Sequence, residues 1–398
     1  MKPRIFVAIH YLELGGAEIS LIGLLNAIDT SRYDVDLFVY SHRGELMKMI
    51  PSGIRLLPEV KEYAQIEKPI KEVLKQGGWK VAWARVWAKY QYRQYVKQAH
   101  PQEGSAIFQY VFDAVTPVLP DLSGYGEYDL AISFLTPHNI VAEKVRAKKK
   151  IAWIHTDYTR ISVDVDKELP VWSRFDKIVS ISKDVTRAFL KVFPSLSDKI
   201  VEINNILSPI FVRKRAEEFP VCFPDNKGRI NLLSVGRYTF AKNYDNVPDI
   251  CKRIREVGCD VYWYIVGYGG DEALIREKIK ESGMEDYVIL LGKKENPYPY
   301  MKACDIYVQP SRFEGNSVTV REAQMLCKPV MVTDYPTAKS QIKDRIDGVV
   351  VPLDNAKCAQ GIVDFIRNQE LQKEITAYLQ AHDYGNEQEI GKLCRFIY

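Results

Sequence analysis

Short apolar runs alternate with helical patterns along the chain, and this alternation limits the possible fold more than any other feature. In the first half, apolar runs that predict strands lie at residues 4–10, 34–40, 128–134, 150–155 and 177–181, and a helical pattern spans 17–28. Strands that are apolar throughout and separated by helices are typical of a parallel sheet covered on both faces. The first half is therefore predicted to be an α/β layer structure.

The second half repeats this architecture without repeating the sequence. Predicted strands lie at 229–235, 261–266, 287–291, 306–309, 329–332 and 348–351, and predicted helices at 246–257, 271–282, 318–326, 356–368 and 371–380. A chain of 398 residues exceeds what one core usually supports. We expect two doubly wound domains, 1–207 and 229–382, whose strand ends face a central cleft where a ligand binds.

The segment between these domains has little periodicity and several prolines. Residues 208–228 include Pro209, Pro220 and Pro224 and are predicted to form a linker. The C-terminal residues 383–398 are expected to form a helix that packs back on the first domain.

Composition favours a soluble, cytoplasmic protein. No run approaches the roughly 18 unbroken apolar residues of a membrane span, and residues 1–9 read as a strand instead of a signal peptide. The seven cysteines lack a C-x-x-C pair and all lie beyond residue 221. This pattern indicates reduced thiols and argues against a disulfide framework or a zinc site.

Two glutamates, Glu314 and Glu322, bracket the most informative segment of the second half. Neighbours on one helix face are about three or four positions apart, so residues with this spacing do not share a face. Glu314 is therefore expected in a loop and Glu322 on the following helix. Between them, Asn316 and Ser317 lie where backbone N–H groups at a helix N-terminus can hold an anion.

Two cations, Arg237 and Lys242, follow the predicted strand 229–235. Arginine can bind two phosphate oxygens at once, and lysine supplies a mobile charge. The ordinary alternative is a solvated loop with two surface cations. A ligand with both phosphates and hydroxyls would engage these cations and the two glutamates together, so we interpret the segment as a nucleotide-sugar site.

Glycines and a histidine follow other predicted strands. Gly15 and Gly16 open the first helix, where they fit either close approach to an anionic ligand or a simple turn. The turn containing Gly267 lacks the G-x-G-x-x-G fingerprint, which disfavours an NAD-dependent oxidoreductase. His155 ends an apolar run and is the best placed histidine for a sugar hydroxyl or phosphate, with a buried structural histidine as the alternative; His10 is second.

Two acidic pairs are candidates for metal ligands. Asp34 and Asp36 begin a strand, and Asp164 and Asp166 lie in a polar loop. Neither pair follows a buried strand into the expected cleft. We therefore predict no metal site.

Residues 68–99 carry eight basic side chains and one acid, Glu72. Trp79, Trp83 and Trp87 share a face of the predicted helix there, which is typical of helices that lie on anionic membranes. The alternative is that the tryptophans pack in the core while the lysines face water. The rest of the chain has no comparable basic stripe, so no nucleic-acid partner is expected.

Several motifs together resemble the retaining glycosyltransferases of family four, the E-x(7)-E type. They are Gly15-Gly16-Ala17-Glu18, Gly236-Arg237 with Lys242, Gly267-Tyr268-Gly269, and Pro310–Gly315 leading to Glu322-Ala323. The resemblance is strong over 229–352 and looser before. It implies the GT-B fold, two Rossmann-like domains with the donor bound mainly by the second, and catalysis without a metal or other cofactor.

The resemblance also implies a role for each matched residue. Arg237 and Lys242 would hold the donor diphosphate, Glu314 would face the transferred sugar, and Glu322 would bind the ribose. The backbone of Asn316, Ser317, Val318 and Thr319 would meet the sugar hydroxyls and the phosphate. Gly16 would approach the diphosphate across the cleft, and His155 would lie near the sugar. Asn316-Ser317 replaces the commoner aromatic-glycine pair, so the donor sugar stays open.

These predictions indicate a hexosyltransferase that moves a sugar from a nucleoside diphosphate sugar, with UDP as the expected nucleotide, to a glycan or lipid-linked acceptor. A role in cell-surface polysaccharide synthesis and a peripheral position on the inner face of the membrane are expected. Two alternatives stay open, a sugar-nucleotide epimerase of the same fold and a non-catalytic nucleotide-sugar-binding subunit.

Overall fold

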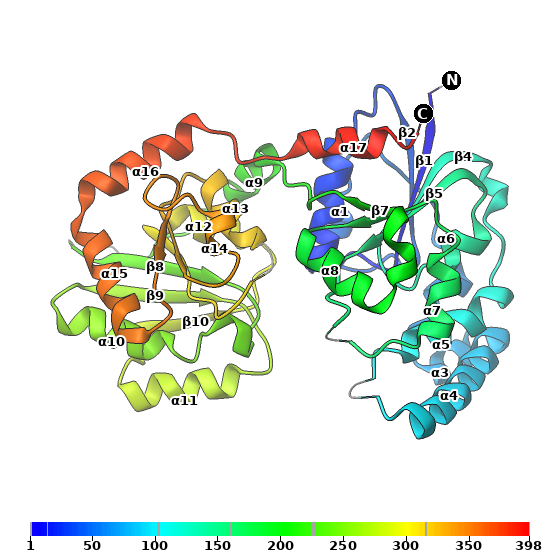
Figure 1. The fold of residues 1–398 in the computed structure, drawn as a ribbon, viewed down its shortest axis with the longest axis horizontal. Coiled ribbons are helices and arrows are strands. Elements are labelled where there is room, and N and C mark those ends of the chain that lie inside the picture. Colours follow the sequence, from blue (N-terminus) through cyan, green and yellow to red (C-terminus); the bar gives the residue numbers. More distant parts are fainter. Residues whose placement is uncertain are drawn as a thin grey trace. The chain divides into compact units, whose positions relative to one another are not determined.

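The computed structural model describes residues 2–13, 15–101, 104–159, 161–223, 228–314 and 317–397. The chain forms two compact units, the first from 1–207 with 386–398 and the second from 208–385. Each unit is a parallel sheet with helices on both faces (Figure 1). The predicted α/β class with two doubly wound domains is confirmed.

The sheet of the first unit has seven strands in the order β3-β2-β1-β4-β5-β6-β7. The strands are β1 Arg4–Ile9, β2 Asp34–Val39, β3 Arg55–Leu56, β4 Tyr128–Ser133, β5 Ala147–Ile154, β6 Lys177–Ser180 and β7 Ile200–Glu202. The helices are α1 Gly16–Ala27, α2 Lys61–Ala64, α3 Ile70–Lys75, α4 Trp79–Ala99, α5 Ile107–Val115, α6 Asn139–Lys144, α7 Val165–Trp172, α8 Lys183–Val192 and α17 Ile390–Cys394.

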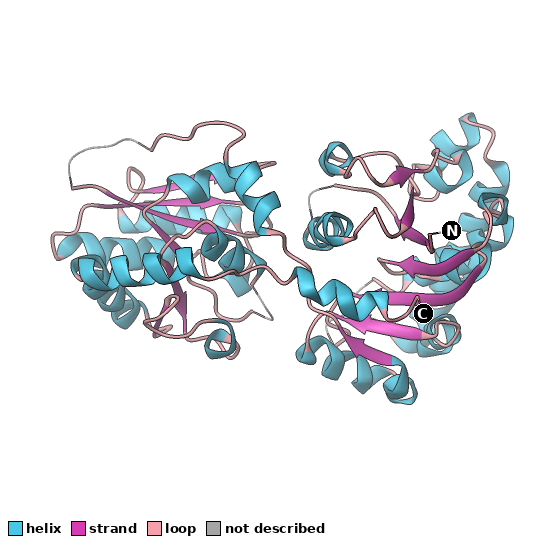
Figure 2. Ribbon diagram, turned by 90° about the horizontal axis from the view of Figure 1, so that it is seen from above, coloured by secondary structure: helices cyan, strands magenta, loops and turns pink. Residues whose placement is uncertain are grey.

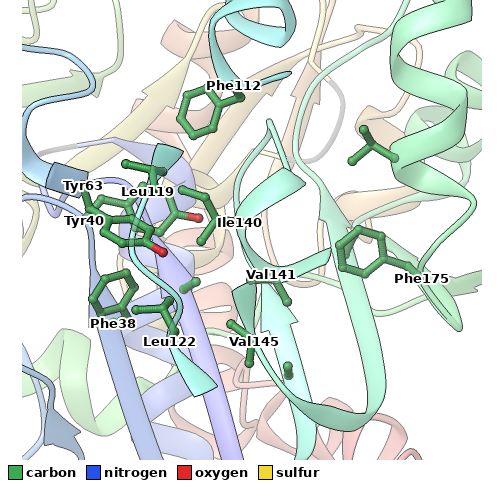
Figure 3. Packing of buried hydrophobic residues seen from close by; sticks show 14 of the residues in the cluster. Phe38, Tyr40, Tyr63, Phe112, Leu119, Leu122, Ile140, Val141, Val145 and Phe175 are labelled. Carbon is green, nitrogen blue, oxygen red and sulfur yellow. The ribbon is translucent and has the colours of Figure 1, made fainter. Parts of the chain in front are cut away.

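The central strands of this sheet are buried on both faces. Val7 of β1 pairs with Leu37 of β2 and with Ile132 of β4, and all three side chains are buried. On one face, Figure 3 shows Tyr40 and Tyr63 close to Phe112, and the ring centroids of the two tyrosines are 6.0 Å apart. Consecutive residues of these strands are therefore buried instead of alternating with exposed ones, as the sequence indicated.

The sheet of the second unit has six strands in the order β10-β9-β8-β11-β12-β13. The strands are β8 Ile230–Val235, β9 Val261–Val266, β10 Val288–Gly292, β11 Ile306–Gln309, β12 Val330–Thr333 and β13 Val349–Val351. The helices are α9 Pro209–Ala216, α10 Val247–Glu256, α11 Glu272–Ser282, α12 Tyr298–Ala303, α13 Val318–Met325, α14 Ala338–Gln341, α15 Asn355–Arg367 and α16 Gln369–Ala381, with a 3₁₀ turn η5 at Phe240–Lys242. Figure 2 shows helices above and below these strands.

Helix starts in the second unit follow from local capping. Asp354 accepts a hydrogen bond from the Lys357 amide (3.0 Å) at the start of α15, and Asn368 accepts one from Leu371 (3.0 Å) at the start of α16. Such side chains satisfy backbone donors that have no partner inside the helix.

The predicted linker is wrong for the residues that the structure describes. Ser208 caps α9, which packs on α12, and the buried Arg215 side chain donates to the Glu295 carbonyl (3.3 Å). The proline-rich sequence was misleading because Pro209 lies at the first turn of a helix, where its missing N–H removes no hydrogen bond. The described part of 208–228 therefore begins the second unit.

The C-terminal residues return to the first unit. Asn386 accepts from the Leu207 amide and donates to the Asn205 carbonyl, both at 2.8 Å. Glu389 accepts from the Asn204 amide (3.1 Å) just before α17. These contacts tie the chain end to the segment that leaves β7.

Candidate functional site

The strand order reverses once in the second unit, between β8 and β11. β9 and β10 continue the sheet on one side of β8, and β11 to β13 continue it on the other. Loops that leave neighbouring strands at such a reversal point diverge, and ligands of open α/β sheets bind in the crevice between them. Arg237 and Lys242 follow β8, and Glu314 follows β11, so the fold brings these predicted residues to that point.

An ion pair joins the two loops. The Lys242 Nζ lies 2.6 Å from Glu314 Oε1, and both side chains are largely buried. The same Glu314 oxygen accepts from Ser311 Oγ (2.6 Å) and Gln309 Nε2 (3.1 Å). Solvent ions screen a partly buried ion pair only weakly, so the attraction between Lys242 and Glu314 is strong. An anionic ligand that binds the Lys242 ammonium would have to compete with Glu314.

Arg237 is the second cation of this site and has a different environment. Its side chain is exposed, and it makes no ion pair with any residue that the structure describes. It follows Gly236, where an added Cβ would lie 2.8 Å from the Tyr244 hydroxyl and 3.2 Å from Lys242 Cε. The glycine thus lets the Lys242 stem lie against the backbone, while Arg237 stays available for an anion.

Sequence reasoning missed the residues that hold these two loops together. Arg312 donates to both carboxylate oxygens of Asp245 (2.9 and 2.7 Å) and to the Phe240 carbonyl (2.7 Å). Its backbone N–H also bonds to the Ala241 carbonyl (2.8 Å). Two parallel charged hydrogen bonds are strong and directional. Arg312 therefore fixes the loop of Lys242 against the loop of Glu314.

A buried polar network lies beneath Glu314. The Gln309 side chain accepts from Tyr307 (2.7 Å) and Thr319 (3.2 Å) and donates to Ser311 (2.9 Å). A glutamine that ends a strand is the only sequence signal for this network. Because every member is paired, the network orients Glu314 rigidly.

The start of α13 differs in part from its predicted role. Gly315 and Asn316 lie outside the described residues. The amide of Ser317 donates to Gln341 Oε1 (3.2 Å), so this N–H is already used. Val318 and Thr319 form the first turn of α13, where backbone N–H groups have no partner inside the helix. An anion at this helix end can still be bound by the free amides of the first turn.

Glu322 is one turn further along α13 and is buried. Its Oε1 accepts from the Tyr298 hydroxyl at 2.6 Å, a partner that the sequence did not indicate. Burial raises the pKa of Glu322 to about 7, against the hydrogen bond from Tyr298, which lowers it. Near neutral pH this carboxyl exchanges between a neutral donor and a charged acceptor, and either form can bind a hydroxyl.

Gly267 is needed for packing. A Cβ on Gly267 would lie 1.9 Å from the Gly236 carbonyl oxygen. Only glycine allows the loop after β9 to pack this closely on the loop that carries Arg237. Gly267 thus shapes the site instead of supplying a side chain to it.

The first unit has its own reversal point, between β1 and β4. Gly15 precedes α1, and a Cβ there would lie 2.2 Å from Glu18 Oε2, whereas Gly16 faces open space. Gly16 therefore leaves the helix N-terminus accessible, as close approach to a ligand requires.

His155 follows β5, two strands from β1 in the sheet. Its ring lies 4.6 Å from that of Phe134, and its Nε2 is buried without a hydrogen-bond partner among the described residues. Burial lowers the pKa of His155 to about 3, so the ring is neutral at physiological pH. The Nε2 atoms of His10 and His138 are also buried without a partner among the described residues, so this feature does not set His155 apart. His10 contacts Glu67 (3.1 Å).

One aspartate of each acidic pair accepts hydrogen bonds from side chains of the first unit. Asp36 is buried and accepts from Arg55 Nε and from the Tyr128 hydroxyl, both at 2.6 Å. Asp164 accepts from the Tyr110 hydroxyl (2.5 Å) and precedes α7. Asp36 is thus fixed inside the first unit.

The tryptophans of α4 are exposed, which contradicts their alternative assignment to the core. The exposed fractions of Trp79, Trp83 and Trp87 are 59%, 69% and 55%. Not all the basic residues are free, because Arg85 donates to the carbonyls of Gln65 and Lys68. Across the described ranges, no helix is both long and apolar enough to cross a membrane.

Comparison with solved structures identifies the fold. A mutant of S. aureus TarM in complex with Fondaparinux, alpha-GlcNAc-glycerol and UDP superposes with a TM-score of 0.66 at 12% identity, over 99% of each chain. Anabaena HepE in complex with UDP and glucose superposes with a TM-score of 0.63 at 16% identity, also over 99% of each chain. The fold is GT-B.

Sequence comparison adds the family that the second unit resembles. Residues 217–382 match the family of glycosyl transferases group 1. The amylovoran biosynthesis glycosyltransferase AmsD of Erwinia amylovora is 28% identical over 197 residues, 48% of this chain and 54% of the relative.

A second relative, from Campylobacter jejuni, is N-acetylgalactosamine-N,N'-diacetylbacillosaminyl-diphospho-undecaprenol 4-alpha-N-acetylgalactosaminyltransferase. It is 31% identical over 144 residues, 36% of this chain and 39% of the relative. The chain thus spans about half or less of the length of these relatives. The matches support a group 1 glycosyltransferase.

Proposed function

We propose that the protein is a retaining glycosyltransferase of family four that transfers a sugar from a UDP-sugar to a glycan or lipid-linked acceptor. The observation that carries this proposal is the Lys242–Glu314 pair at the reversal point of the second sheet, with the exposed Arg237 in the same loop. The two cations suit a diphosphate, and the carboxylate suits the hydroxyl groups of a sugar. A nucleoside diphosphate sugar carries both kinds of group.

The leaving diphosphate gains negative charge as the sugar–phosphate bond breaks. Arg237 and Lys242 stabilise that charge electrostatically, together with the amides of Val318 and Thr319. Because Arg312 and its Asp245 partner fix the Lys242 loop, this stabilisation needs little reorganisation. Glu322 binds the ribose hydroxyls.

The sugar is held by groups that neither attack nor leave. Glu314, once Lys242 turns to the diphosphate, accepts hydrogen bonds from sugar hydroxyls. The acceptor oxygen attacks the anomeric carbon on the face that the diphosphate leaves, and the leaving phosphate takes the acceptor proton. This front-face course retains the anomeric configuration and requires no metal, so chelators should leave activity unchanged.

The names of similar proteins support the choice of donor and acceptor. UDP is bound in both solved structures described above. Amylovoran biosynthesis and a diphospho-undecaprenol acceptor appear in the names of the two relatives. These names support a role in cell-surface polysaccharide synthesis.

Helix α4 would hold the enzyme at the inner face of the membrane. Its exposed tryptophans suit the headgroup region, and Lys80 and Lys89 on the same helix suit anionic lipids. Sedimentation with anionic liposomes should weaken with salt and with Trp83→Ser; unchanged sedimentation of that variant would contradict this role.

Calorimetric titration with UDP tests the donor site. Arg237→Ala should weaken UDP binding at least tenfold, whereas Arg276→Ala, on the exposed face of α11 beside Glu272, should not. Glu314→Gln removes the carboxylate that neutralises Lys242, so it should keep UDP binding and lose sugar transfer from UDP-sugars. Near wild-type UDP affinity in a folded Arg237→Ala variant would refute the assignment.

A further inference from the structure

A groove in the first unit lies apart from the residues assigned to the donor, and of the three exposed tryptophans of α4 only Trp87 lines it. It runs between the C-terminal half of α4 and the start of α7 and encloses about 730 Å³. This volume is within the range of small-molecule sites, roughly 300 to 1,000 Å³. Both walls belong to described residues of one unit, so the groove is complete without any other part of the protein.

One row of side chains on α4 forms the first wall. Trp87, Gln91, Gln94 and Gln98 follow each other at helical spacing and all line the groove. The Trp87 ring stacks on that of Tyr90, with centroids 5.4 Å apart and an interplanar angle of 24°. The wall thus combines a flat aromatic platform with three amides, each able to donate and accept.

The second wall carries carboxylates and a lysine. Asp164, Asp166 and Lys167 line it at the start of α7. Asp164 accepts from Tyr110 (2.5 Å), and Lys167 lies 3.5 Å from Asp113. Asp166 is exposed to the groove.

Aromatic packing keeps the two walls at a fixed separation. Tyr95 on α4 packs on Tyr110 of α5, with ring centroids 5.7 Å apart, and its hydroxyl donates to the Val163 carbonyl (3.4 Å). Ser105 donates to the Ser162 carbonyl (3.0 Å). The groove is therefore preformed, which lowers the entropic cost of binding.

The chemistry of the walls selects among ligand classes. The exposed Asp166 carboxylate disfavours phosphodiester chains, and the three glutamine amides beside the aromatic rings disfavour acyl chains. A pyranose suits both walls, because its C–H face can lie on an aromatic ring while its hydroxyls bond to amides and carboxylates.

We infer that this groove binds a neutral oligosaccharide segment of the acceptor, away from the residue that receives the sugar. The role of the bound oligosaccharide as part of the acceptor rests on the proposed glycosyl transfer. The binding of an oligosaccharide in the groove does not rest on that proposal.

An array of neutral bacterial polysaccharides and of glucose, galactose and N-acetylglucosamine oligosaccharides tests the groove. The full chain should bind a subset of them without donor, and Gln91→Ala/Gln94→Ala should weaken that binding at least tenfold. Arg93→Ala is the matched control, because Arg93 is exposed on the same helix outside the groove and its replacement should leave glycan binding unchanged. UDP affinity should be the same in all three proteins.

Each other outcome is informative. The inference is wrong if the wild type binds UDP but no glycan of the array. It is also wrong if the glutamine variant binds glycans as tightly as the wild type. Loss of liposome binding in the glutamine variant, without glycan binding, assigns the surface to lipid and also overturns it. Glycan binding that needs Gln91 and Gln94 in a protein that does not bind UDP supports the groove and refutes the proposed transfer.

Discussion

Glu322→Gln should remove a pH dependence from the stability of the second unit. The buried Glu322 has a pKa of about 7, against an ordinary value of 4.5 for an exposed glutamate. The folded state therefore keeps this proton between those two pH values, whereas the unfolded chain releases it. The stabilisation is complete below the unfolded pKa and is lost as the pH rises through the folded pKa.

The magnitude follows from the size of the pKa shift. Each pKa unit corresponds to about 1.4 kcal/mol, so the wild type should lose roughly 2 to 3 kcal/mol relative to Glu322→Gln between pH 5 and pH 8. Glutamine keeps an acceptor for Tyr298 and does not titrate. If the glutamine amide packs less well, the free energy of unfolding falls by the same amount at every pH. The slope of this free energy against pH is then unchanged.

Urea unfolding at a series of pH values measures this difference. Groups that titrate in both proteins, such as the half-buried Glu168, cancel when the two free energies of unfolding are subtracted. Glu374→Gln, on the exposed side of α16, is the control and should track the wild type. Parallel curves for wild type and Glu322→Gln would show that burial does not raise this pKa and would refute the reasoning.

Two further predictions concern the loops of the donor site. Gly267→Ala places a Cβ against the Gly236 carbonyl oxygen and should destabilise the second unit by about 2 kcal/mol or more, whereas Gly270→Ala, with no atom near its Cβ, should not. Equal melting temperatures for the two variants would contradict the close approach. Arg312→Ala and Asp245→Asn should each weaken UDP binding about tenfold, because both release the Lys242 loop. The double variant should bind UDP no more weakly than the weaker-binding single variant. If the losses of binding free energy in the two single variants add up in the double variant, the two side chains act separately and the reasoning is wrong.

Local sequence determined the fold class and most of the elements. Strands such as 4–10 and 306–309 are apolar because both faces of a parallel sheet are buried, and this property is visible without any tertiary information. The short edge strands β3 and β7 were missed because their side chains are exposed or half-buried. A strand at the edge of a sheet is defined by its backbone hydrogen bonds to the neighbouring strand. Its residue pattern does not distinguish it from a loop.

Part of the candidate site was also visible in the chain. Arg237, Lys242 and Glu314 were predicted from their places after strands, and the sheet order explains why they share one region. Tyr298, Arg312 and Asp245 were not predicted, since their importance lies in contacts between loops that are far apart in sequence. Nothing local distinguishes such residues from surface arginine, aspartate or tyrosine.

The sequence by itself determined two α/β units, the loops that carry cations and carboxylates, and a helix with an aromatic face. Tertiary structure decided that Lys242 is paired with Glu314, that the carboxyl of Glu322 is buried, and that Trp83 faces solvent. The physical reason is that strand and helix patterns follow from neighbours along the chain. Burial, ion pairing and pKa depend on which distant segments the fold brings into contact.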